Sequence, residues 1–253
     1  MHKLLRIKGK VLFLLLLLDI HDSSYASEFS AELGALRTNY KDFYLSKENL
    51  FHLSAGIGVA AILAHTSIDK EVQGYYQENI RGETTNYISR PGNILGTSYI
   101  TVPLLFITKV FTDIRTKEWA DKSLRAILVG APAGLIIQSV TGASRPEEGD
   151  SRWHPFKDSN GLSGHAFIGS VPFITAAISS NDIRTKIVFY TLSTLPGLSR
   201  INDNKHYLSQ SFLGWYLGYL SCQVVDKKKE EPLNIVILPS NKGAYVVLSY
   251  IIR

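Results

Sequence analysis

The sequence predicts an all-α protein, a helical bundle of about six core helices with a small C-terminal β-hairpin. The 253 residues are 45% hydrophobic and 19% charged, which is enough apolar material to bury a sizeable core. Six segments of helix length contain no Asp, Glu, Lys or Arg, and short polar connections join some of the neighbours, as in antiparallel bundles. The last residues change to a Val-, Ile- and Tyr-rich pattern typical of strands.

The N-terminus has the three parts of a secretory signal peptide. Basic residues precede Lys10, Val11–Leu18 is wholly apolar, and Ser24-Tyr25-Ala26 supplies small residues at the usual cleavage spacing. The apolar run of eight residues is far shorter than a membrane span. We therefore expect residues 1–26 to be a signal peptide and the protein to reach the cell envelope, in the periplasm or associated with a membrane. The alternative is a short anchor that stays attached, and export follows in either case.

The rest of the chain divides by composition. A polar N-terminal segment, 27–48, precedes a catalytic domain, 49–226, and a C-terminal tail, 227–253. The six uncharged segments are Asn49–Ile68, Pro91–Thr108, Ala126–Ser144, Ser159–Asn181, Ile187–Ser199 and Tyr207–Val225. In the tail, Asn234–Leu238 and Ala244–Ile252 flank the turn-like residues 239–243, which predicts the hairpin. It either caps the bundle or pairs with the strand-like residues Leu33–Tyr44.

Two topology rules disagree on whether the six segments cross a membrane. If all six span after an exported N-terminus, the ends that carry the chemical motifs face the cytoplasm. The loops on that side contain 8 Lys and Arg against 13 on the other side, so the positive-inside rule places them outside. The disagreement favours a periplasmic bundle at a membrane surface, and a multispan inner-membrane protein is the alternative.

Charge and cysteine content exclude several other classes. The net charge of +5 is spread along the chain, so we expect no nucleic-acid partner, and no feature predicts a protein partner. Cys222 is the single cysteine, which excludes an internal disulfide and a cysteine-built metal site, and we expect it to be a buried structural thiol. The sequence contains no HExxH or carboxylate-rich metal motif. We therefore predict no metal site.

Three short stretches place arginine, histidine and small residues at the ends of the uncharged segments. They are Ser144-Arg145-Pro146, Leu162-Ser163-Gly164-His165, and Ser199-Arg200 followed by His206. Phosphoryl transfer uses such a set: guanidinium groups for phosphate oxygens, backbone amides at a helix start, a nucleophile and a proton donor.

In their order and internal spacing these stretches resemble the signature motifs of the type 2 phosphatidic acid phosphatase and vanadium haloperoxidase superfamily. Those motifs are Lys-x6-Arg-Pro, Pro-Ser-Gly-His and Ser-Arg-x5-His-x3-Asp, and here they cover Gln138 to Gln210. Asp69–Arg81 and Asn93–Phe106 match more loosely the helices that pack around such a site. The resemblance implies an all-α phosphatase.

The resemblance also assigns roles to residues. It implies that His206 attacks phosphorus and that His165 protonates the leaving oxygen and then activates water. Arg145 and Arg200 would hold the phosphate oxygens. Ser163 and the Gly164 amide would complete the cradle.

Three residues depart from the pattern. Gln138 replaces the first Lys, so a fixed positive charge is missing from the phosphate site unless Arg152, Lys157 or Lys205 compensates. Gln210 replaces the Asp that orients the nucleophile; its carbonyl can still fix the histidine tautomer but carries no charge. Leu162 replaces Pro, which affects loop stiffness more than chemistry.

Other histidines have ordinary interpretations. His154 lies between the first two motifs and either lines the pocket or is a loop histidine beside Trp153. His52 and His65 are expected to be packing or boundary residues of an apolar helix.

The sequence thus predicts a phosphatase for phosphate monoesters or lipid phosphates and diphosphates, acting through a phosphohistidine. The partner would be a phosphorylated small molecule or lipid. We expect no cofactor, with vanadate as a possible inhibitor. The alternatives are a weak or silent phosphate-binding protein on the same fold, because of Gln138 and Gln210, and a vanadate-dependent haloperoxidase.

Overall fold

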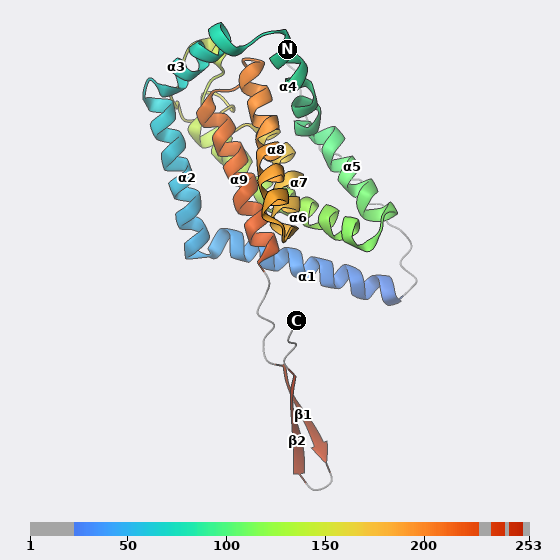
Figure 1. Cartoon of the computed structure of the whole chain (residues 1–253). Helices are drawn as coiled ribbons and strands as arrows, with labels where there is room; N and C mark the ends of the chain where they lie inside the picture. The colour runs from blue at the N-terminus through green and yellow to red at the C-terminus, as the bar shows by residue number, and fades with distance from the viewer. Residues whose placement is uncertain (1–22, 228–233, 241–242, 250–253) are drawn as a thin grey trace, which may run out of the picture. The chain divides into compact units, whose positions relative to one another are not determined.

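The structure is a computed structural model that describes residues 23–227, 234–240 and 243–249 (Figure 1). The α-helices are α1 (Ser23–Leu45), α2 (Lys47–His65), α3 (Ile68–Tyr75), α4 (Glu83–Gly96), α5 (Ser98–Phe111), α6 (Ile114–Thr141), α7 (Gly164–Ser179), α8 (Ile183–Asn202) and α9 (Leu208–Asp226). A π-helical turn (Tyr76–Ile80) extends α3, and a 3-10 turn (Pro146–Glu148) lies between α6 and α7. This confirms the all-α fold class. Nearly all of the predicted signal peptide lies outside the described residues, and Ser24-Tyr25-Ala26 falls in the first turn of α1.

The C-terminal tail contains the expected hairpin. Strands β1 (Asn234–Ser240) and β2 (Gly243–Ser249) pair antiparallel, from Asn234 opposite Ser249 to Ser240 opposite Gly243. The suggestion that the hairpin pairs with Leu33–Tyr44 is wrong, because those residues are helical in α1.

The helical period, not the strand-like composition, determines the structure of Leu33–Tyr44. Tyr40 and Tyr44 are four residues apart and stack on one face of α1, with ring centroids 5.8 Å apart. Both hydroxyls reach α6 where Pro132 interrupts its hydrogen bonding. Tyr40 donates to the Leu128 carbonyl (2.7 Å), which lies four residues before the proline and lacks its helical partner. These bonds fix the end of α1 against α6 within the compact unit that begins at Asn39.

Helix α6 begins twelve residues before the predicted Ala126. The added turns are rich in charge, and their charges pair along the helix surface. Lys122 is 3.1 Å from Glu118 and Arg125 is 2.9 Å from Asp121, both at the i,i+4 spacing of one helix face. These turns carry charged side chains that pair at the surface, so a pattern based on uncharged segments does not include them.

The predicted segment Pro91–Thr108 is two helices. The chain leaves the helical region at Thr97 (φ −82°, ψ 115°), directly after Gly96, and α5 starts at Ser98 with a bend of 62°. Thr97 Oγ1 donates to the Asn93 carbonyl (2.8 Å), which satisfies an acceptor left open at the end of α4. The break turns the last residues of α4 towards α7 and α8.

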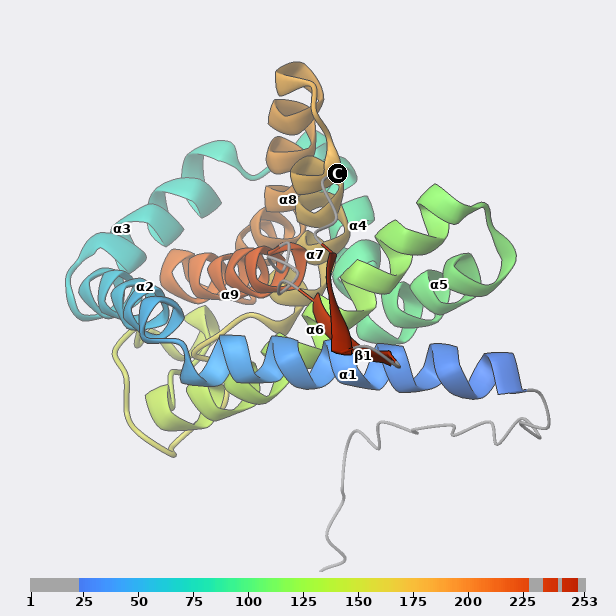
Figure 2. The ribbon, with the colours of Figure 1, turned by 90° about the horizontal axis from the view of Figure 1, so that it is seen from below.

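Helix α7 packs against both α8 and α9, and the other helices surround this pair of contacts (Figures 1 and 2). Helix α4 packs on α8, α6 and α2 pack on α9, and α5 packs on α6. Gly214 and Gly218 on α9 permit its close approach to α7, since a Cβ at Gly214 would lie 2.3 Å from the Ser163 carbonyl oxygen. Cys222 is buried at this contact as expected, and burial raises the pKa of its thiol to about 12.

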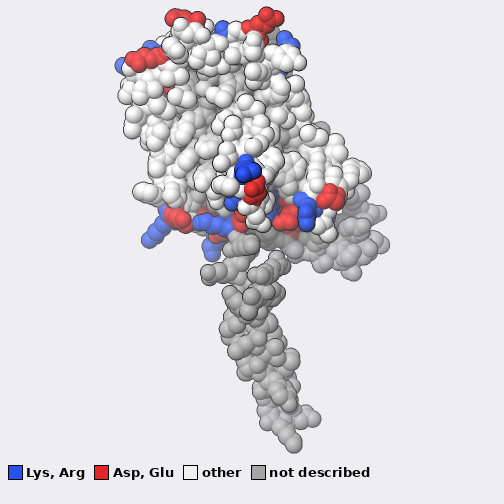
Figure 3. All heavy atoms as spheres, viewed as in Figure 1, with Lys and Arg blue, Asp and Glu red and all other residues white. Residues whose placement is uncertain are grey.

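The surface of the helices is unusually apolar. In Figure 3, Lys, Arg, Asp and Glu gather at two ends of the helices, and a broad uncharged band between them is interrupted by a small charged group. Large hydrophobic side chains are exposed on α2, α4, α5, α6 and α8. Within the described residues, one helix is long and apolar enough to cross a membrane, in the stretch Ile114–Glu148. Up to three segments qualify if α2 with α3, and α4 with α5, each count as one bent span.

Candidate active site

The first motif follows a turn that requires glycine. Helix α6 ends at Gly142, whose φ of 56° is left-handed, and a Cβ there would lie 1.8 Å from the His154 carbonyl oxygen. The chain then runs through Ser144 to Arg145. Arg145 is exposed, and its Nε donates to Asn160 Oδ1 at 3.1 Å, while its terminal nitrogens have no hydrogen-bond partner among the described residues. The turn thus directs a tethered guanidinium to the loop end of the bundle.

The second motif forms the N-terminus of α7. The Ser163 hydroxyl is the N-cap and accepts from the Ala166 amide at 3.2 Å, while the Ser163 amide donates to the Gln210 carbonyl at 2.9 Å. The amides of Gly164 and His165 belong to the first helical turn and have no partner among the described residues. They form a donor pair suited to an anion.

The third motif is a tight return after α8. The amides of Lys205 and His206 both donate to the Arg200 carbonyl, at 2.9 and 3.2 Å. The loop from Arg200 to His206 therefore folds back onto the last turn of α8. This places the side chains of Arg200 and His206 at the same end of the bundle as α7's first turn.

His206 is 7% exposed and has a fixed partner. Its Nδ1 lies 2.8 Å from Gln210 Oε1, which also accepts from the Tyr207 amide at 3.1 Å. Because an amide oxygen only accepts, Nδ1 carries the proton and Nε2 keeps its lone pair. Burial is the main cause that lowers the pKa of His206 to about 4, and the charges of Arg200, Arg145 and His165 lower it further. The hydrogen bond to Gln210 raises the pKa and so opposes this shift.

His165 lies on the first turn of α7, half-buried, with no hydrogen bond to its ring from any described residue. Burial lowers its pKa to about 4; Arg200 lowers it further and Asp203 opposes the shift. Its position is set by α4, since a Cβ at Gly96 would lie 2.8 Å from the His165 Cβ. The electrostatic coupling of Arg145, His165, Arg200 and His206 shows that the structure brings these four predicted residues together.

This constellation coincides with the part of the chain that matches a known family. Residues 136–228 match the model of the PAP2 superfamily. No curated protein and no solved structure matches the chain significantly. PAP2 members are mostly phosphatases, so the match supports a hydrolase of the phosphatase type.

Two departures from the PAP2 pattern contact each other. Gln138 Nε2 donates to the Leu162 carbonyl at 2.8 Å, and Leu162 is 1% exposed. The amide that replaces the motif lysine therefore braces the loop that precedes Ser163. Of the residues considered as a substitute for that lysine, Lys205 is paired with Glu147, and Arg152 and Lys157 are exposed on the loop.

The remaining histidines of the PAP2 region and α2 are in ordinary environments. His154 is exposed, and its Nε2 lies 2.7 Å from Asp150 Oδ2, as in a loop ion pair. His65 packs edge-on against Trp153, with ring centroids 5.7 Å apart. No group of three or more His, Cys, Asp or Glu side chains in the described residues has the arrangement of a metal site.

Sequence reasoning missed three residues that contact the PAP2 motifs. Asp69 of α3 is fully buried and accepts from the Ser209 amide (2.8 Å) and hydroxyl, which caps the start of α9. Burial raises the pKa of Asp69, against its bonds to Ser209. Asn93 and Asp203 form a second network behind Arg200. A single acidic or amide residue carries no periodic signal, so no sequence pattern points to these contacts.

Proposed function

We propose that this chain is a phosphoric ester hydrolase that works through a phosphohistidine at His206. The observation that carries the proposal is the bond between His206 Nδ1 and Gln210 Oε1, because it leaves Nε2 unprotonated in a buried position. The low pKa of His206, about 4, keeps the ring neutral at physiological pH. A neutral imidazole with a fixed tautomer is a competent nucleophile.

The chemistry proceeds in two balanced steps. The Nε2 lone pair of His206 forms a bond to phosphorus as the ester P–O bond breaks, and protonated His165 gives its proton to the leaving alkoxide oxygen. Neutral His165 then takes a proton from water while the water oxygen attacks phosphorus. The P–N bond breaks, inorganic phosphate leaves, and both histidines return to their starting states.

The phosphate oxygens are held by groups of fixed geometry. Arg145 and Arg200 supply guanidinium donors, and the amides of Gly164 and His165 supply the N-terminus of α7. Ser163 acts by capping that turn. The Gln138 side chain donates one amide hydrogen to the Leu162 carbonyl and so supports the loop before Ser163. Its second amide hydrogen can donate to the phosphate. We propose that the reaction needs no cofactor.

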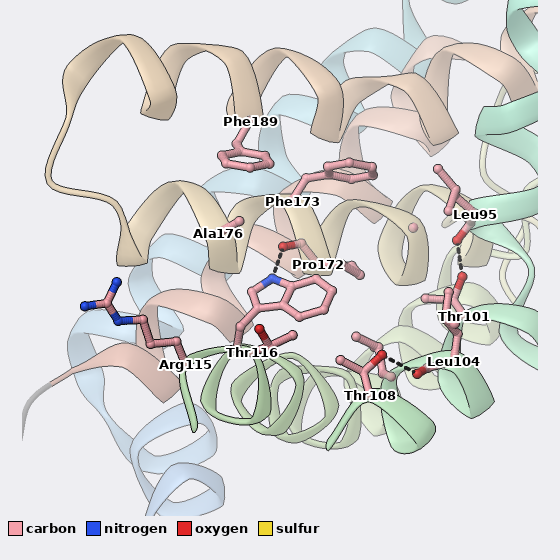
Figure 4. A pocket seen from close by; sticks show the side chains of 13 residues that line it. Leu95, Thr101, Leu104, Thr108, Arg115, Thr116, Pro172, Phe173, Ala176 and Phe189 are labelled. Atoms are coloured by element: carbon pink, nitrogen blue, oxygen red, sulfur yellow. Dashed lines mark hydrogen bonds between the residues drawn. The ribbon is translucent and has the colours of Figure 1, made fainter. Parts of the chain in front are cut away.

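An apolar cavity, one helical turn along α7 from His165, favours a substrate with a hydrophobic chain. The cavity, about 480 Å³, lies between α5, α6, α7 and α8 (Figure 4). Leu95, next to Gly96, lines one end and Arg115 the other. Gly169, one helical turn after His165, also lines it. Leu95 of the lining adjoins Gly96, which packs against His165, so we propose that the cavity takes the chain of the substrate and that lipid phosphates or diphosphates are the substrate class.

We further propose that the protein works at a membrane of the cell envelope. The exposed hydrophobic side chains and the uncharged band support contact with lipid, which also supplies a hydrophobic phosphoester. The expected result is that the native protein sediments with membranes and resists a high-salt and alkaline wash. Recovery in the soluble fraction before any wash contradicts this location.

The test of activity is phosphate release by the full mature chain from a panel of soluble and lipid phosphates. We expect His206→Ala to abolish release, and His52→Ala, an exposed histidine on α2, to leave it unchanged. Orthovanadate should inhibit by competing for the phosphate site. Equal turnover by His206→Ala contradicts the assignment of the nucleophile. Orthovanadate binding without phosphate release from any substrate favours the silent or haloperoxidase alternatives.

The substrate class has its own test. Ala176→Trp fills the cavity from α7 without touching the motif residues. We expect this variant to raise KM for a long-chain phosphoester at least tenfold and to leave p-nitrophenyl phosphate hydrolysis near the wild-type rate. Equal losses on both substrates, or none, contradict the chain-binding role of the cavity.

A further inference from the structure

A hydrogen-bond network that involves none of the signature residues of the three motifs except Arg200 fixes the Arg200 side chain. The Asn93 carboxamide of α4 uses both of its ends: Oδ1 accepts from Arg200 Nη1 at 2.7 Å, and Nδ2 donates to the Asp203 carboxylate. Asn93 thus bridges a cation and an anion that are three residues apart at the end of α8. The bridge comes from a helix 107 positions away in sequence.

Asp203 lies at the C-terminus of α8, where the helix dipole makes a negative charge unfavourable. It is the C-cap of α8, and a carboxylate at a helix C-terminus meets the negative end of the helix dipole. Donors from two helices compensate: besides Asn93, the Ser89 hydroxyl lies 3.3 Å and the side-chain Nδ2 of Asn202 lies 3.2 Å from Asp203 Oδ1. A charge kept at an unfavourable position by dedicated partners indicates a role beyond capping.

The bridge determines what Arg200 offers a ligand. Nη1 is occupied by Asn93, and the buried Nε has no hydrogen-bond partner among the described residues. A buried N–H without a partner costs stability, and a phosphate oxygen is the acceptor that the motif assigns to this side chain. With one nitrogen fixed, the planar guanidinium cannot rotate freely, so its remaining donors keep one direction.

We propose that Asn93 and Asp203 are positioning residues of the phosphate site. Asn93 fixes the guanidinium of Arg200, and Asp203 supplies the local negative charge beside Arg200 and His165. The proposal rests on the function proposed above and adds Asn93, which lies outside the motifs, and Asp203, which occupies a variable position of the third motif. The carboxylate that the family pattern has at position 210 is absent here, and Asp203 places a carboxylate on the side of the proton donor.

The charge of Asp203 has a direct consequence for His165. The protonation of His165 is set by its burial and by the charges of Arg200 and Asp203. Arg145 and His206 lie in the same group of interacting charges. Asp203 raises the pKa of His165 against the other two influences. The proton donor must be protonated, whereas its pKa in the free protein is about 4, so the charge of Asp203 extends activity towards higher pH.

The first test is Asp203→Asn, which preserves shape and removes the charge. We expect the high-pH limb of kcat/KM to move to lower pH by about half a unit or more, because the pKa of His165 falls further. Asp203→Glu should restore most of the wild-type profile. A purely structural role predicts a lower rate at every pH with no displacement of the limb, and that result overturns the assignment of Asp203.

The second test is Asn93→Ala, with orthovanadate affinity and KM as readouts. Loss of a bond to a charged group should weaken orthovanadate binding about tenfold or more. Asn79→Ala is the matched control, since that carboxamide bonds the Tyr75 carbonyl in its own helix. Wild-type affinity and KM in Asn93→Ala overturn the positioning role of Asn93. If that variant does not fold, the pH profile of Asp203→Asn decides.

The outcomes separate this inference from the proposed function. If the wild type releases phosphate and the variants match it in KM, affinity and pH profile, the positioning role is wrong and the phosphatase assignment stands. If the wild type binds orthovanadate but releases no phosphate, the phosphatase assignment fails. Calorimetric binding to Asn93→Ala then still tests the bridge, and unchanged affinity contradicts it.

Discussion

At the residue scale, Gln210 performs a function that an aspartate could not. Its Oε1 accepts from His206 and Tyr207, and its Nε2 donates to the Ser144 carbonyl at 2.7 Å. A carboxylate has no hydrogen to give the buried Ser144 carbonyl. The substitution therefore joins the first motif to the third and preserves the histidine tautomer, while it gives up charge stabilisation of the imidazolium.

Two variants at position 210 should separate the hydrogen bonds of Gln210 from its lack of charge. Gln210→Leu removes all three bonds, and we expect kcat to fall about 10- to 100-fold, with about 1 to 3 kcal/mol of stability lost. Gln210→Glu keeps the acceptor for His206 and should raise the pKa of His206, which moves the low-pH limb of activity upward. Steady-state kinetics and urea unfolding measure both effects. An unchanged kcat in Gln210→Leu contradicts the orienting role.

The sequence could predict the motif residues because their spacing is local, within Gln138 to Gln210. It could not predict Asp69, Asn93 or Asp203 as part of the site. Asn93 meets its partners over 107 and 110 positions, and Asp69 meets Ser209 over 140. Only the packing of α3 and α4 against the ends of α8 and α9 brings Asp69 and Asn93 to the motifs, and Asp203, although close in sequence to Arg200, acquires its partner Asn93 by the same packing.

At the element scale, the contact of α4 with α7 determines where His165 lies. Gly96 ends α4 directly beside His165, and a side chain there would meet both the Cβ and the backbone oxygen of His165, at 2.8 and 3.0 Å. The break of the α4–α5 segment after Gly96 is therefore part of the site. Composition alone predicted one continuous helix there, because neither residue at the break carries a charge.

Gly96→Ala should displace His165 and lower kcat about tenfold or more, with a loss of stability from the overpacked contact. Gly74→Ala is the matched control. Gly74 lies in α3 with no neighbour within 4 Å of an added Cβ, so alanine should be neutral or stabilise by about 0.5 to 1 kcal/mol. Wild-type kcat in Gly96→Ala contradicts the positioning of His165 by α4.

At the scale of the whole molecule, the conflict between the two topology rules has a structural origin. The count assumed six spans, but Pro91–Thr108 bends at Thr97 and α7 has 16 residues, fewer than the roughly 20 that a span needs. By length and composition, one to three segments of the described chain qualify. Helical class and motif placement were predictable because both depend on local pattern, whereas breaks and membrane exposure depend on packing.

The buried histidines make stability depend on pH. The folded-state pKa of His206, about 4, lies below the ordinary value of 6.5, so the unfolded chain binds protons first as pH falls. The stability of the ligand-free protein should be full above about pH 6.5 and decline towards pH 4, by about 3 kcal/mol from His206. His206→Gln should show a shallower decline in denaturant unfolding. Equal pH slopes for the two proteins contradict the buried neutral histidine.

Capture of the phosphoenzyme establishes or refutes His206 as the nucleophile. Wild-type protein is mixed with a radiolabelled phosphoester, quenched in alkali, where phosphohistidine survives, and digested for peptide mapping. We predict label on the peptide that contains His206, no label in His206→Ala, and accumulated label in a His165→Ala variant given a substrate whose leaving group needs no proton. Phosphate release without label on His206, or label on another residue, contradicts the account.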